Sequence, residues 1–188
     1  MIGARCEVPA RRSRAVLPVL ALVGLSLPVQ APAQGVRGGA DSVRVQLAGV
    51  ERVDADAGDG PQVEVRVAIV HAKAFHSWPD EPVVPAELRG LNPIATSVRV
   101  ASAPEGVELL GAEWPDPVPV TVRYAADPLE LLSFVDTTVA RLRVRVPPGL
   151  EADANLELQV QFQSCDEEYC YPPRRETLAV PLAPESTP

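Results

Sequence analysis

Apolar and polar residues alternate along most of the chain after residue 41, and this pattern predicts an all-β protein. In five segments Val, Leu and Ile recur at every second position, with Arg, Glu and Gln between them. A strand with one face in the core and the other in water requires this period of two. We therefore expect half-buried antiparallel strands at 42–48, 62–70, 96–101, 138–146 and 155–162.

Shorter alternating runs extend this pattern to a complete domain. They predict further strands at 107–110, 119–124 and 176–180, and Gly- and Pro-rich turns at 58–61, 104–106 and 147–149 separate the runs. Seven or eight short strands over about 140 residues are typical of an immunoglobulin-like antiparallel β-sandwich. A β-barrel is the alternative architecture.

Two segments interrupt the alternation. The segment 75–92 contains His76, Trp78 and several prolines, and we expect a long loop or an edge excursion there. The segment 114–134 begins with Trp114 and ends with Phe134, and its stretch 129–132 is expected to form a short turn or a flap. Long irregular loops in a compact domain are often functional, although covering the core is a competing role.

The first 33 residues have the composition of an export signal. Four arginines precede an apolar run at 15–29, and Ala31-Pro32-Ala33 gives the small-x-small pattern of a cleavage site. The apolar run is shorter than the roughly 20 residues that span a bilayer, so we expect export without membrane insertion. The expected organisation is a signal peptide at 1–33, a flexible leader at 34–41, one domain at 42–183 and a tail at 184–188.

Export determines the expected charge and the compartment of the mature chain. Loss of four Arg and one Glu moves the net charge from -8 to -11, and the acidic body has no basic stripe. This composition argues against nucleic acid and anionic membranes as partners. The mature chain is expected in an oxidising compartment, in which neighbouring cysteines form disulfides.

The cysteines are the strongest chemical signal. Cys6 lies in the signal, which leaves Cys165 and Cys170 with four residues between them. The simplest geometry is a hairpin-like loop with the cysteines at its base, where facing Cα atoms lie about 4.5–5.5 Å apart. A disulfide across so short a loop stabilises the fold by only roughly 2 kcal/mol, so a redox-active pair is favoured over a structural staple. The staple stays the alternative.

The neighbours of the cysteines refine this interpretation. Asp166, Glu167 and Glu168 disfavour a nearby thiolate, which suits a pair that reacts when a chosen partner docks. Tyr171, Pro172 and Pro173 follow Cys170 directly. Two prolines cannot donate to a β-ladder, so they leave a rigid apolar edge beside the sulfur as a candidate docking surface.

The segment from Phe162 to Leu182, FQ-x-C-x4-C-YPP continuing to TLAVPL, resembles the N-terminal periplasmic domain family of the thiol:disulfide interchange protein DsbD. The upstream succession of strands and the AFHSW segment are compatible with the same domain. This resemblance implies an immunoglobulin-like sandwich that passes electrons by thiol–disulfide exchange in the periplasm of a Gram-negative bacterium. It also implies that Cys170 forms the mixed disulfide with the partner and that Cys165 resolves it.

The resemblance implies partners and a shielding loop as well. The electron donor would be a membrane thiol reductase, and the acceptors would be oxidised periplasmic thioredoxin-fold proteins. The family protein continues into a membrane domain whereas this sequence ends at Pro188, so we expect either that the reductase is a separate protein or that the domain has another role. A cap loop would cover the oxidised pair; 114–134 is its candidate, with Phe134 or Trp114 as the shield. The alternative from another class is an immunoglobulin-like binding or assembly module whose disulfide only fixes the loop.

Other chemistries lack support in the sequence. His71 and His76 have no accompanying ligand cluster, so we expect no metal, and no cofactor motif is present. The sequence contains no nucleophile elbow and no glycine-rich phosphate loop, which argues against hydrolases and nucleotide enzymes.

Overall fold

The structure is a computed structural model that describes residues 42–53, 60–151 and 153–182. The expected signal peptide, leader and C-terminal tail lie outside these residues, as does the first half of the 58–61 turn. Within the described residues no helix is long and apolar enough to cross a membrane.

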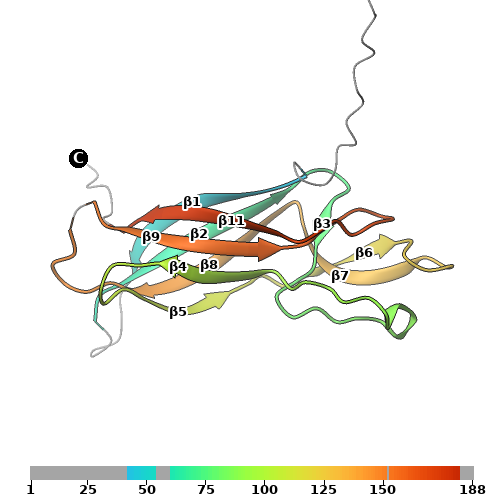
Figure 1. Ribbon diagram of the computed structural model, residues 1–188, viewed down its shortest axis with the longest axis horizontal. Helices are drawn as coiled ribbons and strands as arrows, with labels where there is room; N and C mark the ends of the chain where they lie inside the picture. The colour runs from blue at the N-terminus through green and yellow to red at the C-terminus, as the bar shows by residue number, and fades with distance from the viewer. Residues whose placement is uncertain (1–41, 54–59, 152, 183–188) are drawn as a thin grey trace, which may run out of the picture. The chain divides into compact units, whose positions relative to one another are not determined.

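The first sheet contains the long N-terminal hairpin. Its order is β1-β2-β8-β5, formed by β1 (Val43–Val53), β2 (Gln62–His71), β8 (Thr137–Arg145) and β5 (Glu108–Glu113), and every pairing is antiparallel (Figure 1). The alternate residues Val63, Val65 and Val67 of β2 are buried. The period of two in the sequence therefore turns one face of this sheet inward.

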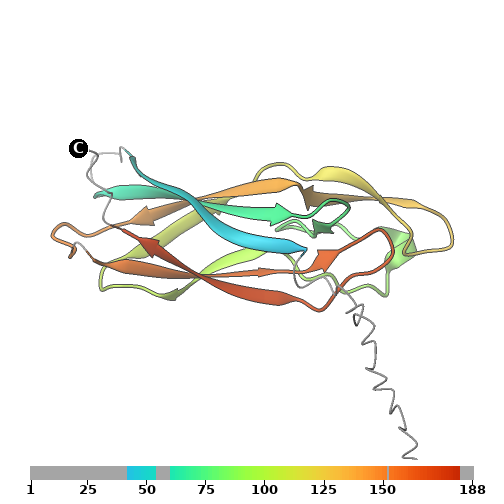
Figure 2. The same ribbon diagram turned by 90° about the horizontal axis from the view of Figure 1, so that it is seen from above.

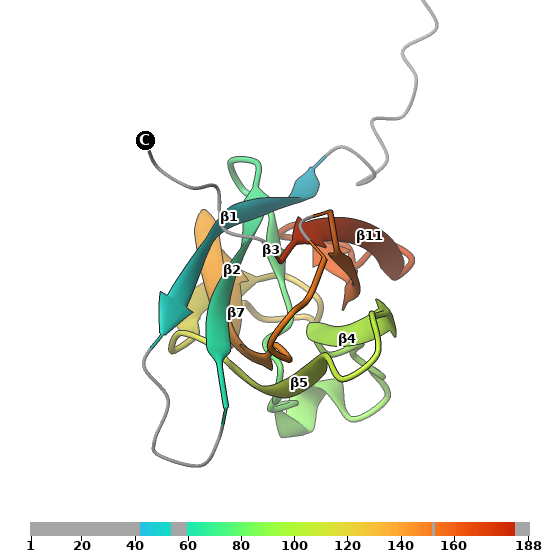
Figure 3. The same ribbon diagram turned by 90° about the vertical axis from the view of Figure 1, so that its left-hand side faces the viewer.

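The second sheet packs its apolar face against the first. It has the order β11-β9-β4, with β11 (Arg174–Pro181) and β4 (Ser97–Ser102) on either side of β9 (Asn155–Phe162). Viewed end-on, the two sheets form separate layers (Figure 3). Their inner residues make up one buried cluster, which we call the main core: Val43, Val63, Val65, Val67, Ile69, Ala140, Leu142, Val144, Leu156, Leu158, Val160, Phe162, Val180 and Leu182.

A third sheet lies at the end of the domain that carries the cysteines. Its order is β10-β3-β7-β6, formed by β10 (Ser164–Cys165), β3 (His76–Ser77), β7 (Leu129–Val135) and β6 (Val118–Val122). Figures 1 and 2 show β6, β7 and the loop after β10 extending past the ends of the two main sheets. A short 3-10 helix at Ala86–Leu88 adds the buried Leu88 to this end.

The structure confirms the all-β, antiparallel, immunoglobulin-like sandwich, and the described strands form sheets with free edges instead of a closed barrel. Two of the Gly-containing turns are also confirmed, because Gly106 and Gly149 adopt φ angles of 80° and 82°. The prediction of a turn or flap at 129–132 is wrong. These residues belong to the seven-residue strand β7, which pairs with β6 on one side and β3 on the other. The sequence shows no alternation here because apolar residues occupy both faces of the strand. Leu131 is buried, whereas the adjacent Leu132 on the opposite face is 46% exposed.

Candidate functional site

Cys165 and Cys170 form a disulfide at the base of a short loop. Cys165 ends β10, and the two cysteines also form an isolated antiparallel bridge with a Cα–Cα distance of 4.0 Å. We call residues 165–170 the cysteine loop. The cysteine loop lies between β9 and β11 in sequence. These two strands pair with each other from Phe162 and Arg174 onward. The predicted hairpin-like geometry is therefore present.

Hydrogen bonds within the cysteine loop hold its shape. Asp166 N–H donates to the Tyr169 carbonyl over 2.8 Å, and the Asp166 carboxylate accepts the N–H groups of Glu168 and Tyr169, each at 2.8 Å. The Tyr171 hydroxyl donates to the same carboxylate over 2.6 Å. Burial alone would raise the pKa of Asp166, but these three hydrogen bonds outweigh it and lower that pKa below its usual value.

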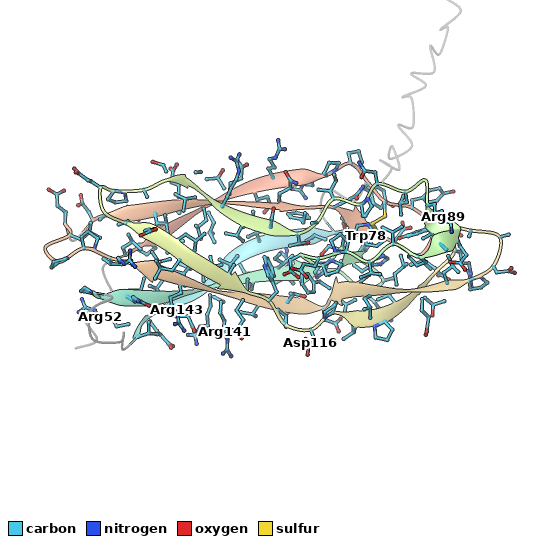
Figure 4. All side chains as sticks on the ribbon, turned by 90° about the horizontal axis from the view of Figure 1, so that it is seen from below. Arg52, Trp78, Arg89, Asp116, Arg141 and Arg143 are labelled. Carbon is cyan, nitrogen blue, oxygen red and sulfur yellow. A yellow bond between two sulfur atoms is a disulfide. The ribbon has the colours of Figure 1, made fainter. Side chains whose placement is uncertain are left out.

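The two sulfur-bearing residues differ in their access to solvent. Cys165 is fully buried, whereas Cys170 is only partly buried. Cys165 belongs to a second apolar cluster with Trp78, Leu88, Val122 and Leu131, which we call the cysteine cluster. Figure 4 shows the disulfide close to the labelled Trp78. Of the two cysteines, Cys170 is therefore the residue with access to solvent.

Tyr124, which follows β6, brings its hydroxyl group to the disulfide. The oxygen lies 3.6 Å from Sγ of Cys170 and 3.1 Å from Nε2 of His76, and the hydroxyl donates to the Asp166 carbonyl over 2.7 Å. Burial, assisted by the negative charge of Asp166, raises the pKa of Tyr124. The phenol therefore stays protonated at neutral pH and acts as a hydrogen-bond donor, not as a base.

His76 faces Cys165 across the β3–β10 pairing and is 3% exposed. Burial lowers its pKa to about 4, with a further lowering from the nearby His71, so the ring is neutral at pH 7. The phenol of Tyr124 has one proton, which it donates to the Asp166 carbonyl. The contact with His76 therefore requires that Nε2 carry the imidazole proton and donate it to the phenol oxygen.

The cysteine loop is attached to the segment after β6 by more than Tyr124. Arg123 N–H donates to the Glu167 carbonyl over 2.7 Å, and the Arg123 guanidinium lies 2.9 Å from the Glu167 carboxylate. Both side chains are half exposed, at 61% and 50%, so the backbone bond contributes more to this attachment than the ion pair does.

The three residues after Cys170 lie where a partner could touch them. Pro172 and Pro173 are exposed, and Tyr171 is partly buried with its ring 6.1 Å from that of Phe75. Tyr171 N–H donates to the Ser164 carbonyl over 2.8 Å, which fixes the chain direction just beyond Cys170. The hydrogen bond to Asp166 is the main cause that raises the pKa of the Tyr171 hydroxyl.

Phe134 and Trp114, the predicted shields, stack on each other with ring centroids 5.5 Å apart. Phe134 is 2% exposed, and Trp114 packs against the main core. Within the segment 114–134, Tyr124 makes a polar contact with Cys170, and Val122 and Leu131 pack in the cysteine cluster with Cys165. The shielding role of Phe134 and Trp114 stays a prediction.

Sequence reasoning did not assign a role to Tyr124 or His76 at the disulfide. No local motif links them to the cysteines, because Tyr124 and Cys170 are 46 residues apart and the third sheet brings them together. His71 is structural in this arrangement: its ring nitrogens contact the Ser77 hydroxyl at 2.9 Å and the Asp136 carbonyl at 3.2 Å.

The described residues contain no group of three or more His, Cys, Asp or Glu side chains arranged to hold a metal ion. Cys165 and Cys170 are joined to each other, and His76 is engaged with Tyr124. The chemistry that this end of the domain offers is therefore that of a disulfide with a phenol and a neutral imidazole beside it.

No protein-family model matches the sequence, and no curated protein matches it. Among solved structures, the N-terminal periplasmic domain of ScsB from Proteus mirabilis is similar over 77% of this chain, with 14% identity and a TM-score of 0.48. The chain spans 49% of that structure's length.

The second similar structure is the DsbD N-terminal domain of Neisseria meningitidis in the reduced form. The similarity extends over 80% of this chain and 94% of that domain, with 14% identity and a TM-score of 0.45. This is the domain whose motif the cysteine segment resembles. At such identities the similarity concerns the fold alone.

Proposed function

We propose that this domain is a thiol–disulfide exchange relay, which takes two electrons from a membrane thiol reductase and passes them to oxidised periplasmic proteins through Cys165 and Cys170. The observation that carries this proposal is the placement of the disulfide across a loop that backbone hydrogen bonds already close. Asp166 pairs with Tyr169, and Tyr171 pairs with Ser164, without help from the sulfurs.

A disulfide in this position adds little to the fold. It joins residues that are five apart, so it restricts the unfolded chain by only about 2 kcal/mol in the loop-entropy treatment. The strands on either side are held by the β9–β11 ladder. The bond can therefore open and close while the sandwich stays intact, which is what a relay requires and what a structural staple does not need.

The difference in burial supports a division of roles between the sulfurs. In the first half-reaction a thiolate of the reductase attacks Sγ of Cys170, and the S–S bond breaks with its electron pair going to Cys165, which takes a proton. The second thiol of the reductase then displaces Cys170 from this mixed disulfide. The domain now holds two thiols, and the reductase holds a disulfide.

In the second half-reaction the Cys170 thiolate attacks the disulfide of the acceptor protein. Cys165 then attacks Sγ of Cys170 in the mixed disulfide and releases the acceptor as a dithiol. Two electrons and two protons pass in each half-reaction. Tyr171, Pro172 and Pro173 are proposed as the docking edge, because they follow Cys170 and the two prolines are exposed.

We also propose that the protein works in the periplasm of a Gram-negative bacterium. The basic and apolar composition of residues 1–33 supports export, and the proposed chemistry requires a compartment in which disulfides form. Residues 42–183 would then be the working domain.

Trapping of mixed disulfides tests the relay. In Cys165→Ala no second thiol can resolve a mixed disulfide on Cys170, so this variant should accumulate mixed disulfides with periplasmic proteins. Cys170→Ala should accumulate few. Every variant carries Cys6→Ser, so that any adduct comes from the pair. The proposal fails if neither variant traps a partner while the periplasm is supplied with reducing equivalents.

A redox titration separates the relay from a binding module with a structural disulfide. The relay predicts that the pair equilibrates with ordinary thiol reductants. A reduction potential well below about -300 mV would place the bond out of their reach and would favour the binding module.

A further inference from the structure

The contacts of the Tyr124 hydroxyl around Cys170 lead to an inference that deepens the proposed function. Its oxygen has three neighbours: the Asp166 carbonyl at 2.7 Å, Nε2 of His76 at 3.1 Å and Sγ of Cys170 at 3.6 Å. A phenol has one proton to donate and two lone pairs that accept. In the disulfide form the proton goes to the Asp166 carbonyl, since a carbonyl can only accept.

Reduction changes what the sulfur offers to this hydroxyl. A protein dithiol supplies two electrons and two protons, so the disulfide becomes two thiols, and loss of one proton to solvent gives the Cys170 thiolate. A thiolate is a charged acceptor, and hydrogen bonds to charged acceptors are roughly twice as strong as those to neutral ones. The thiolate therefore outcompetes the neutral Asp166 carbonyl for the single phenol proton.

We propose that Tyr124 is a two-position hydrogen-bond donor, which serves the Asp166 carbonyl while the disulfide is closed and turns to the Cys170 thiolate once the disulfide is open. His76 is the positioning residue for this donor. Its Nε2–H donates to the phenol oxygen in both states, and this bond polarises the phenol toward giving its proton to the sulfur.

The hydrogen-bonded series from His76 through Tyr124 to Cys170 is partly shielded from solvent. His76 is 3% exposed, and Tyr124 and Cys170 both pack against the cysteine cluster. Hydrogen bonds are stronger there than in water, and an unassisted thiolate is less stable. A dedicated donor at Cys170 therefore matters more than it would at an exposed cysteine.

Charged and titratable groups also surround the series His76–Tyr124–Cys170. Among the described residues, none of the contacts of these groups provides another hydrogen-bond donor to the sulfur of Cys170. Asp166 and Glu167 are acidic and disfavour the thiolate. The Arg123 guanidinium is paired with Glu167, and the Tyr171 hydroxyl donates to Asp166. His71, which is close enough to affect the pKa of His76, contacts the Ser77 hydroxyl and the Asp136 carbonyl through its ring nitrogens. Tyr124 is thus the neutral donor within reach of Cys170.

The test measures the acidity of the Cys170 thiol and needs no partner protein. All variants carry Cys6→Ser and Cys165→Ala, so that Cys170 is the one thiol, and its alkylation by iodoacetamide is followed from pH 5 to pH 11. Tyr124→Phe removes the donor and keeps the ring. We expect the midpoint of the pH profile to rise by about one unit, which is about tenfold less thiolate at neutral pH.

A matched control and a rescue variant accompany this measurement. Tyr169→Phe removes a hydroxyl from the same loop, on a side chain that is 65% exposed, and should leave the midpoint unchanged. His76→Leu should raise the midpoint in the same direction by a smaller amount. His76→Gln, whose amide nitrogen can replace the Nε2–H, should restore most of the difference.

An unchanged or lower midpoint in Tyr124→Phe would overturn the inference, as would an equal shift in Tyr169→Phe. Failure of His76→Gln to differ from His76→Leu would overturn the positioning role of His76. The inference rests on the proposed function only in taking Cys170 as the attacking sulfur. If the midpoint shifts as expected but no mixed disulfide can be trapped, the relay fails and the hydrogen-bond assignment stands.

Discussion

The hydroxyl oxygen of Tyr124 lies 3.6 Å from Sγ of Cys170, although 46 residues separate them in sequence. The antiparallel pairing of β6 with β7, and of β7 with β3, carries Tyr124 to the same end of the domain as the cysteine loop. The same phenol also contacts His76 of β3 and the Asp166 carbonyl. One side chain thus connects the disulfide, the third sheet and the cysteine loop.

The two single cysteine variants should differ in stability although both lose the same disulfide. Cys165 is fully buried in the cysteine cluster, whereas Cys170 is partly exposed, so Cys165→Ala also leaves a small cavity. We expect Cys165→Ala to be less stable than Cys170→Ala by about 1 kcal/mol in urea unfolding. Equal stabilities would contradict the burial of Cys165 in this cluster.

Acid should destabilise the fold through His76. Its pKa is lowered to about 4 in the folded protein from 6.5, so between these values the unfolded chain binds a proton that the folded chain does not. The contribution of neutral His76 to the free energy of unfolding is therefore fully present above about pH 6.5 and decreases as the pH drops toward 4. The loss is at most about 3 kcal/mol, because each pKa unit is worth about 1.4 kcal/mol.

Denaturant unfolding of the wild-type protein and His76→Gln at pH 7 and pH 4.5 measures this effect. The variant should lose less stability between the two pH values. Burial also lowers the pKa of His71, so part of the acid dependence stays in the variant. An identical loss in both proteins would contradict the role given to His76.

Asp166 should stabilise the cysteine loop in its ionised form. Its carboxylate accepts hydrogen bonds from Tyr171, Glu168 and Tyr169, and its pKa is lowered as a result. We expect Asp166→Asn to reduce stability at pH 7 by about 1 kcal/mol, a modest value because the carboxylate is partly exposed.

This contribution is present above the ordinary carboxyl pKa near 3.8 and is lost as the pH falls through the lowered folded value. The difference between the wild-type protein and Asp166→Asn should therefore shrink at strongly acidic pH. Glu168→Gln removes the same charge from an exposed position in the same loop and is the matched control. If it destabilises the protein as much as Asp166→Asn, general charge and not the hydrogen bonds would explain the effect.

Trp78 should tolerate loss of its N–H better than loss of its volume. It is 1% exposed in the cysteine cluster, and its Nε1 has no hydrogen-bond partner among the described residues. Trp78→Phe thus gives up no hydrogen bond and should cost about 1–2 kcal/mol, whereas Trp78→Ala should cost about 3–5 kcal/mol. Thermal unfolding of both variants measures the difference. A Phe variant as unstable as the Ala variant would reveal a partner for Nε1.

The sequence by itself determined the sandwich and the disulfide. Alternation places apolar residues on one face of strands such as β2 and β9, and short-range geometry brings together two cysteines that are only five residues apart. Both signals are local, so a single sequence contains them. The strand β7 was not predicted because its sequence, LELLSFV, has apolar side chains on the exposed face as well as on the buried face.

Only the tertiary structure decided which side chains surround the sulfurs. Tyr124 and His76 reach the disulfide through the register of β6, β7, β3 and β10, and no spacing along the chain encodes that register. The tertiary fold also decided that Cys165 is buried while Cys170 stays partly exposed. A local motif fixes the distance between two sulfurs, but their solvent access and hydrogen-bond donors depend on strands that are distant in sequence.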